Sequence, residues 1–205
     1  MNYRADTANE LVTAAVDLFS RHGYDGTSVR AITSHAGANL GAITYHFGSK
    51  EALYEAALAS VAEPIRKLIA EAADSTGDPL PRIERIVRVF FQYLSERPEF
   101  PNLISQQLAG SRPLPAPARS ILQQNLRTLA TLIAEGQEDG SIRSGNPRDL
   151  ALSVASQPMW LTLARRALLE GAGLDQDDPS THDQIVESVV QFVRAGLKKH
   201  PEGQP

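Results

Sequence analysis

The feature that most constrains this fold is a helical spacing of apolar residues that continues through most of the chain. The spacing is clear near the N-terminus, where steps of three and four residues separate Ala8, Leu11, Val12, Ala15, Leu18 and Phe19. Such steps place side chains on one face of an α-helix. Similar patterns cover roughly 50–73 and 81–96, whereas no segment combines two-residue alternation with hairpin turns. The sequence therefore predicts an all-α protein.

Composition removes several classes of site. The 205 residues include no cysteine, which excludes disulfides, thiolate metal sites and a cysteine nucleophile, and fits a reducing compartment. No apolar run approaches the ~18 residues of a membrane span, and the polar N-terminus is unlike a secretion signal. We therefore expect a cytoplasmic protein with no membrane partner.

Catalytic and metal-binding motifs are missing from the sequence. It contains no HExxH, no G-x-S-x-G and no Walker loop, and His182 has no second ligand at helical spacing. We therefore expect no enzymatic activity, no catalytic residue, no cofactor and no metal.

Helix boundaries are marked by capping residues and prolines. Asn146 and Pro147 are typical of a helix start, and Asp178 and Pro179 repeat that pattern before a last helix that should end near Lys199. Thr27 is the predicted cap of a short helix in the N-terminal part of the chain. These signals favour a compact N-terminal unit, 1–50, followed by a larger helical bundle, 51–205.

Two short helices joined by the turn "AGAN" match a helix-turn-helix between residues 27 and 50. In the second helix, Ile43 and Phe47 share one face, which we expect to be buried. The residues predicted to point outward are Gly41, Ala42, Thr44 and Tyr45. A solvated helix normally carries charge there, so this small, uncharged face suits a surface covered by a binding partner.

The stretch "TSVRAITSHAGANLGAITYHFGSKEALYEAAL" resembles the N-terminal signature of the TetR family of transcriptional regulators. The resemblance covers about residues 8–58 and rests on the pattern G-x-N/S-x-G/A-x-I/L-x-Y-H/Y-F-x-S/N-K-x-x-L. It implies about nine helices, a three-helix DNA-binding domain with a helix-turn-helix, and a C-terminal bundle that holds a small ligand. It also implies a homodimer bound to double-stranded DNA.

The same resemblance implies roles for individual residues. Positions that meet base edges or the adjacent backbone are Asn39, Leu40, Gly41, Ala42 and Thr44. Positions that contact phosphates are Tyr45, His46 and Lys50, and Thr27 and Ser28 are expected to offer hydroxyl and N–H groups to a phosphate. Many relatives have Lys where this chain has Leu40, and often Thr or Ser in place of Ala42. An Arg–guanine contact is therefore not available on this helix, and methyl contacts and DNA shape gain weight.

Charge supports a contact with few phosphates. The whole chain carries a net charge of −4, which by itself argues mildly against nucleic acid. Between Phe19 and Lys50, however, three basic residues face one acidic residue, so the segment is net positive. We expect a shallow salt dependence of DNA binding.

Residues of the C-terminal bundle are weaker candidates. The predicted ligand-binding residues are Phe90, Phe91, Phe100, Gln107, Met159 and Trp160, for which ordinary core packing is the alternative. The last helix has an apolar face wider than one core requires, which predicts a dimer interface through Ile185, Val189, Phe192 and Val193. A helix wholly buried within its own subunit is the alternative.

Together these observations predict a ligand-responsive, homodimeric transcriptional regulator. We expect a repressor that releases a palindromic operator when a small lipophilic or aromatic effector binds. The alternative is a helical small-molecule binding protein or carrier without a DNA role.

Overall fold

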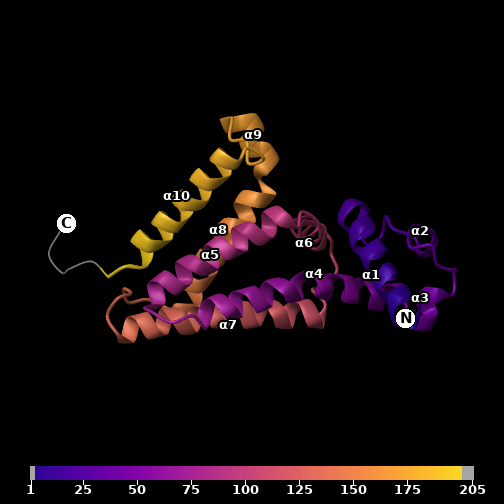
Figure 1. The fold of residues 1–205 in the computed structure, drawn as a ribbon, viewed down its shortest axis with the longest axis horizontal. Coiled ribbons are helices and arrows are strands. Elements are labelled where there is room, and N and C mark those ends of the chain that lie inside the picture. The colour runs from indigo at the N-terminus through magenta and orange to yellow at the C-terminus, as the bar shows by residue number, and fades with distance from the viewer. Residues whose placement is uncertain (1–2, 200–205) are drawn as a thin grey trace. The chain divides into compact units, whose positions relative to one another are not determined.

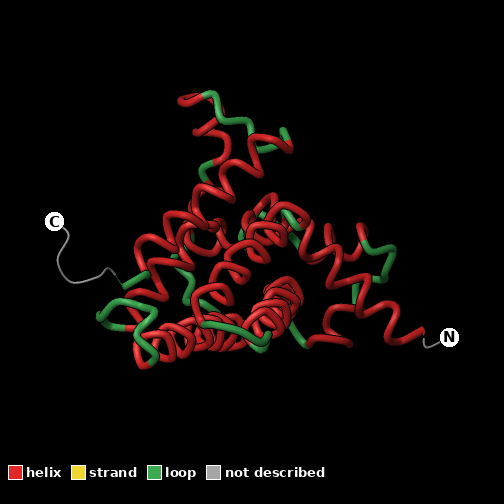
Figure 2. The backbone as a smooth tube through the Cα atoms, turned by 60° about the vertical axis from the view of Figure 1, so that its left-hand side comes forward, coloured by secondary structure: helices red, strands yellow, loops and turns green. Residues whose placement is uncertain are grey.

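The computed structural model describes residues 3–199, which fold into ten α-helices joined by loops (Figures 1 and 2). The helices are α1 Tyr3–His22, α2 Val29–His35, α3 Ala42–Phe47, α4 Lys50–Ala73, α5 Pro79–Glu96, α6 Glu99–Ala109, α7 Ala116–Glu138, α8 Pro147–Leu163, α9 Arg165–Ala172 and α10 Pro179–Leu197. Over these residues the only β-type pairing is an isolated bridge between Ile142 and Lys198. The predicted all-α fold is confirmed.

The helix count exceeds the expected nine or so because the segment after Pro147 is divided. The helix that starts at Pro147 ends at Leu163, because the chain leaves regular helical geometry at Ala164, where ψ is 1°. The backbone N–H of Ala164 still donates to the Trp160 carbonyl, so the break is a short corner between α8 and α9.

The helices form two compact units that do not follow chain order. One contains the chain through Pro64 together with Arg97–Ile121, and the other contains Ile65–Glu96 together with the chain from Leu122 onward. Pro64 lies inside α4 and is the last residue before this division. The functional division at residue 50 stays a prediction.

The first unit is built around the apolar face of α1, which packs against α2 and α6. Leu11, Ala15 and Phe19 of α1 are fully buried, as their spacing predicted. Burying several large apolar side chains on one face contributes about 1.5–3 kcal/mol each, which holds these short helices in place.

The second unit is built around α5, which packs against α8 and α10. The buried stripe of α5 contains Ile83, Ile86, Val87, Phe91 and Leu94. The predicted starts of α8 and α10 are confirmed, because the Asn146 side chain accepts from the Arg148 N–H and the Asp178 side chain accepts from the Thr181 N–H.

Ion pairs also join α5 to α10. The Arg194 guanidinium donates two hydrogen bonds to the nearly buried Glu84 carboxylate, one of them 2.6 Å from Nη2 to Oε2. Arg88 pairs with Glu187 on the same two helices.

Within residues 3–199, no helix is long and apolar enough to cross a membrane. The same residues hold no group of three or more acidic, histidine or cysteine side chains arranged to bind a metal ion.

Candidate nucleic-acid interface

The helix-turn-helix begins at Ser28, which caps α2. Its hydroxyl accepts a hydrogen bond from the Ala31 N–H at 3.0 Å. The sequence assigned this cap to Thr27, and that assignment is wrong. The Thr27 side chain is buried, and its hydroxyl lies 2.8 Å from the Gly23 carbonyl and 3.2 Å from that of Leu18.

This inward position also corrects the expected phosphate contact of Thr27. Its backbone N–H donates to the Tyr24 carbonyl, so neither of its donor groups is offered to DNA. Thr27 instead closes the corner between α1 and α2, whereas Ser28 remains exposed.

Glycines set the two turns that flank α3. Gly37 follows α2 with φ of +64°, and Gly48 ends α3 with φ of +80°. Both values lie in the left-handed region that a Cβ disfavours. The short turn after Gly37 allows α2 and α3 to remain in contact.

The outer face of α3 is exposed and uncharged. Thr44 is exposed, and Tyr45 has 63% of its surface accessible, as does Leu40 just before the helix. Ile43 is buried, as expected, and Phe47 is half-buried. A large exposed apolar or aromatic side chain on a small head is typical of a surface that meets a partner.

Ala42 does not belong to this outer face. Only 5% of its surface is exposed, so the expectation that it points outward is wrong. The helix begins one residue after Gly41 and is only six residues long, so a small change in phase moves Ala42 inward beside Ile43. Gly41 and Asn39 are exposed, as predicted.

The remaining predicted phosphate contacts lie at the end of α3 and the start of α4. His46 is half-buried, with its ring edge-on to Tyr45 at a centroid distance of 4.9 Å. Lys50 donates from Nζ to the Tyr24 carbonyl at 2.6 Å. Burial lowers the Lys50 pKa, Asp25 opposes that shift, and Arg112 adds to it.

Arg30 is a candidate that the assignment from sequence left out. It lies in the first turn of α2, it is exposed, and it forms no ion pair with any part of the chain that the structure describes. Arg21, by contrast, pairs with Asp17 at 2.7 Å. The signal that identifies Arg30 is its position on α2, the first helix of the helix-turn-helix. In helix-turn-helix proteins this first helix crosses the DNA backbone and contacts phosphates.

This geometry defines a class of protein. It is a helix-turn-helix DNA-binding domain followed by a larger helical unit. The domain consists of a capped first helix, a glycine turn and a short second helix with an exposed, uncharged face. Two family models then identify the family within this class. Residues 11–57 match "Bacterial regulatory proteins, tetR family", and residues 79–193 match "Tetracyclin repressor-like, C-terminal domain". The chain belongs to the TetR family of transcriptional regulators.

Individual relatives agree with this assignment. The transcriptional regulator RutR of Escherichia coli (strain K12) is 27% identical over 198 residues, which are 92% of this chain and 89% of RutR. The repressor NicS of Pseudomonas putida is 27% identical over 202 residues, which are 94% of this chain and 93% of NicS. The structure of FadR from Bacillus subtilis in complex with stearoyl-CoA covers 91% of this chain and 97% of its own, with a TM-score of 0.76 and 18% identity.

The predicted ligand-binding residues are divided between the two units. Phe100 and Gln107 are buried in the first unit, where the Gln107 side chain accepts from the Tyr54 hydroxyl and donates to the Arg112 carbonyl. In the second unit, Phe91 is part of the core, whereas 61% of the Trp160 surface is exposed. Phe90 and Met159 are half-buried.

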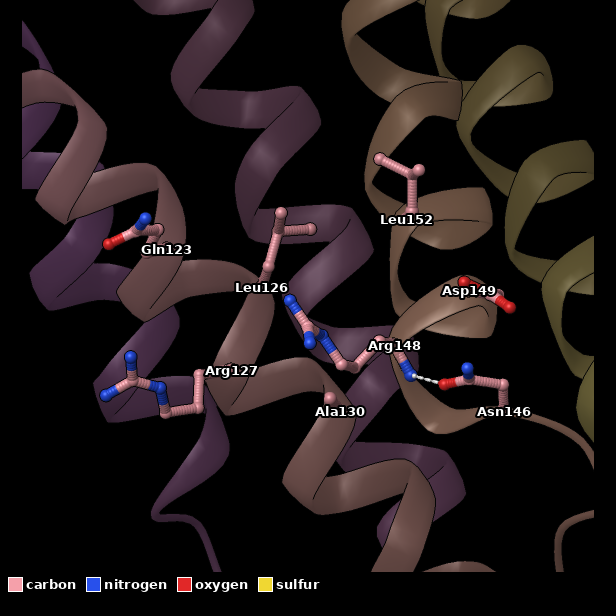
Figure 3. A pocket seen from close by; sticks show the side chains of 8 residues that line it. All are labelled: Gln123, Leu126, Arg127, Ala130, Asn146, Arg148, Asp149 and Leu152. Carbon is pink, nitrogen blue, oxygen red and sulfur yellow. Dashed lines mark hydrogen bonds between the residues drawn. The ribbon is translucent and has the colours of Figure 1, made fainter.

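A groove in the second unit lies between α7 and the start of α8 (Figure 3). Its volume is about 640 Å³, and its lining residues are Gln123, Leu126, Arg127, Ala130, Asn146, Arg148, Asp149 and Leu152. Figure 3 shows the Arg148 side chain extending from α8 toward Leu126, while Asp149 points toward the opposite side of α8. None of the predicted ligand-binding residues lines this groove.

The predicted interface residues of α10 separate into two groups. Val189 and Val193 are buried within their own unit, so the expectation that they form a free dimer surface is wrong. They belong to the stripe that packs against α5 and α8. Phe192 is 64% exposed and Ile185 is half-buried, so the helix has an inner apolar stripe and a separate outer aromatic residue.

Proposed function

We propose that the protein is a dimeric repressor that binds a palindromic operator and releases it when a small molecule binds the C-terminal bundle. The observation that carries this proposal is the exposed face of α3, where Thr44 and Tyr45 point outward with no charged neighbour on the helix. A large exposed aromatic ring on a short helix face that carries no charge is typical of a surface that a binding partner covers.

DNA contacts are divided by chemistry. We assign base-edge contacts to Asn39, Leu40, Gly41 and Thr44, because amide, methyl and hydroxyl groups recognise base edges and Gly41 permits a close backbone approach. We assign phosphate contacts to Ser28, Arg30, Tyr45, His46 and Lys50. The absence of an arginine on α3 leaves part of the specificity to DNA shape.

The proposed dimer uses the outer surfaces of α8 and α10. Phe192 of α10 and Trp160 of α8 are each more than half exposed. Large apolar side chains on two neighbouring helices suit the self-complementary interface of a two-fold dimer. In a two-fold dimer the two recognition helices can enter successive major grooves, which lie about 34–36 Å apart. This symmetry is the reason for expecting a palindromic operator.

The effector is proposed to be lipophilic with an anionic group. The solved FadR relative binds stearoyl-CoA, which combines an acyl chain with phosphates. The groove between α7 and α8 has a similar combination, since Leu126 and Leu152 lie near Arg148. Arg148 forms no ion pair within the described chain, so its charge is available to an anion. As a regulator of transcription, the protein is proposed to act in the cytoplasm.

Selection of genomic fragments by the full-length protein, followed by footprinting, tests the proposal. The expected result is protection of two half-sites related by a palindrome, with affinity lost on addition of the effector. Mass spectrometry of molecules retained after native purification identifies that effector. If the protein retains a ligand but protects no DNA at any salt concentration, it is a carrier and the proposal is wrong.

A further inference from the structure

Tyr24, at the corner after α1, is approached by two cations. The Nζ atom of Lys50 lies 4.1 Å from the centroid of the Tyr24 ring, and the guanidinium carbon of Arg112 lies 3.9 Å from the same centroid. The ring is also held by Phe19, stacked at 5.8 Å, and by Tyr54, edge-on at 5.1 Å. A cation over an aromatic face is attracted by the ring quadrupole, so the ring is a fixed platform for both charges.

Arg112 belongs to this cluster although it lies far along the chain, between α6 and α7. Its Nη2 atom lies 2.7 Å from a carboxylate oxygen of Glu51, and its backbone carbonyl accepts from the Gln107 side chain at 2.8 Å. The Gln107 side chain is itself buried and accepts from the Tyr54 hydroxyl at 2.8 Å. These contacts fix both the main chain and the guanidinium of Arg112.

We propose that Arg112 is a positioning residue for DNA binding that acts through Lys50. This inference rests on the proposed DNA-binding function. Lys50 uses one ammonium proton for the Tyr24 carbonyl, and two remain for a phosphate. The Arg112 guanidinium stabilises the position of Tyr24. The carbonyl of Tyr24 in turn fixes the position of the Lys50 ammonium group by accepting its hydrogen bond.

Arg112 also balances charge at the start of α4. Glu51 follows Lys50 directly, and its carboxylate repels any phosphate that Lys50 binds. The 2.7 Å pair with Arg112 neutralises that carboxylate. Arg112 itself is occupied by Glu51 and Tyr24, so its effect on DNA passes through its neighbours.

The test compares operator affinity and its salt dependence for five variants of the full-length protein. In Arg112→Gln, we expect about five- to tenfold weaker binding, and a log–log salt slope smaller by about one per chain, because Lys50 loses its phosphate contact. Arg119→Gln is the matched control. Arg119 is an exposed arginine of α7 in the same unit, and the structure gives it no ion pair among the described residues. This control should bind like the unaltered protein.

Three further variants separate positioning from simple loss of structure. Arg112→Lys keeps a cation beside Glu51 and should recover part of the affinity. The double variant Arg112→Gln/Lys50→Gln should bind no more weakly than Lys50→Gln alone, because both changes remove the same contact. Thermal unfolding identifies a variant that has lost its fold. If Arg112→Gln unfolds, the comparison of Arg112→Lys with Arg119→Gln replaces it.

Equal affinity and equal salt slope for Arg112→Gln and Arg119→Gln would overturn the role of Arg112 and leave the DNA-binding function intact. Additive losses for Lys50 and Arg112 would overturn it as well, because they would show independent contacts. Failure of the unaltered protein to bind any selected DNA overturns the proposed function, and the role of Arg112 with it.

Discussion

At the scale of single residues, the sequence could not show which side chain points into the protein between α1 and α2. Thr27 and Ser28 are adjacent hydroxyl residues, and either one fits the sequence pattern of a helix cap. The structure selects Ser28 because the Thr27 hydroxyl is directed to the carbonyls of Leu18 and Gly23 at the end of α1. That choice depends on tertiary packing at the α1–α2 corner, so local sequence did not determine it.

Gly136 provides a prediction at this scale. A Cβ atom built there would lie 2.5 Å from Cδ1 and 2.6 Å from Cγ1 of Ile142. We expect Gly136→Ala to lower the free energy of unfolding by about 1–3 kcal/mol, because the clash exceeds the gain in helix propensity. Denaturant unfolding measures the change.

Gly171 of α9 is the matched control, because a Cβ there meets nothing within 4 Å. Gly171→Ala should leave stability unchanged or raise it by up to about 1 kcal/mol. A neutral or stabilising effect of Gly136→Ala would show that Ile142 moves aside without cost.

At the scale of helices, the sequence predicted which segments are helical better than it predicted which face of each helix is buried. The spacing of α1 and the proline starts of α8 and α10 were sufficient to place those helices. The phase of α3 was not, because a helix of six residues has too few apolar positions to distinguish the inward Ala42 from the outward Thr44. For α10, a broad apolar face did not show which residues pack within the subunit.

The cap of α10 predicts how stability depends on acid. Hydrogen bonds from the Ser180 hydroxyl and then from the Thr181 N–H lower the pKa of Asp178 below its ordinary value. A carboxyl with a lowered pKa in the folded state stabilises the protein above its ordinary pKa, and this contribution is lost as the pH falls through the lowered value. Protonation should therefore weaken the cap below about pH 4.

Asp178→Asn tests this dependence, because asparagine also caps helices but does not titrate. Thermal unfolding from pH 7 to pH 2 should show a smaller loss of Tm in the variant than in the unaltered protein. Parallel curves for the two proteins would mean that the Asp178 carboxylate contributes nothing to the acid dependence.

At the scale of the whole molecule, the structure leaves aromatic side chains on the outside of the second unit. Phe192 and Trp160 are each more than 60% exposed. The sequence suggested Trp160 for a ligand site. Sequence alone, however, does not show whether an aromatic residue of a helix faces a cavity or the outside. The same ambiguity explains why the predicted ligand residues are divided between two units.

Phe192→Glu tests the proposed dimer. A charge at the centre of an apolar interface should raise the dimer dissociation constant by at least about thirtyfold, the scale of an interface hot spot. Sedimentation equilibrium should then detect monomer where the unaltered protein is dimeric. Leu108→Glu places the same charge at a site 72% exposed in the first unit and should leave the dimer intact. A dimer unaffected by Phe192→Glu would place the interface elsewhere.

The central claim is that the outer face of α3 contacts base edges, and Thr44→Val tests it most directly. Valine keeps the methyl group and the volume of threonine but removes the hydroxyl. The measurement is the ratio of affinities for the selected operator and for operators altered at one base pair in each half-site. We predict that the variant loses about tenfold or more of this discrimination at one position while its Tm stays within a few degrees. Unchanged discrimination at every position in a folded Thr44→Val protein would contradict the account.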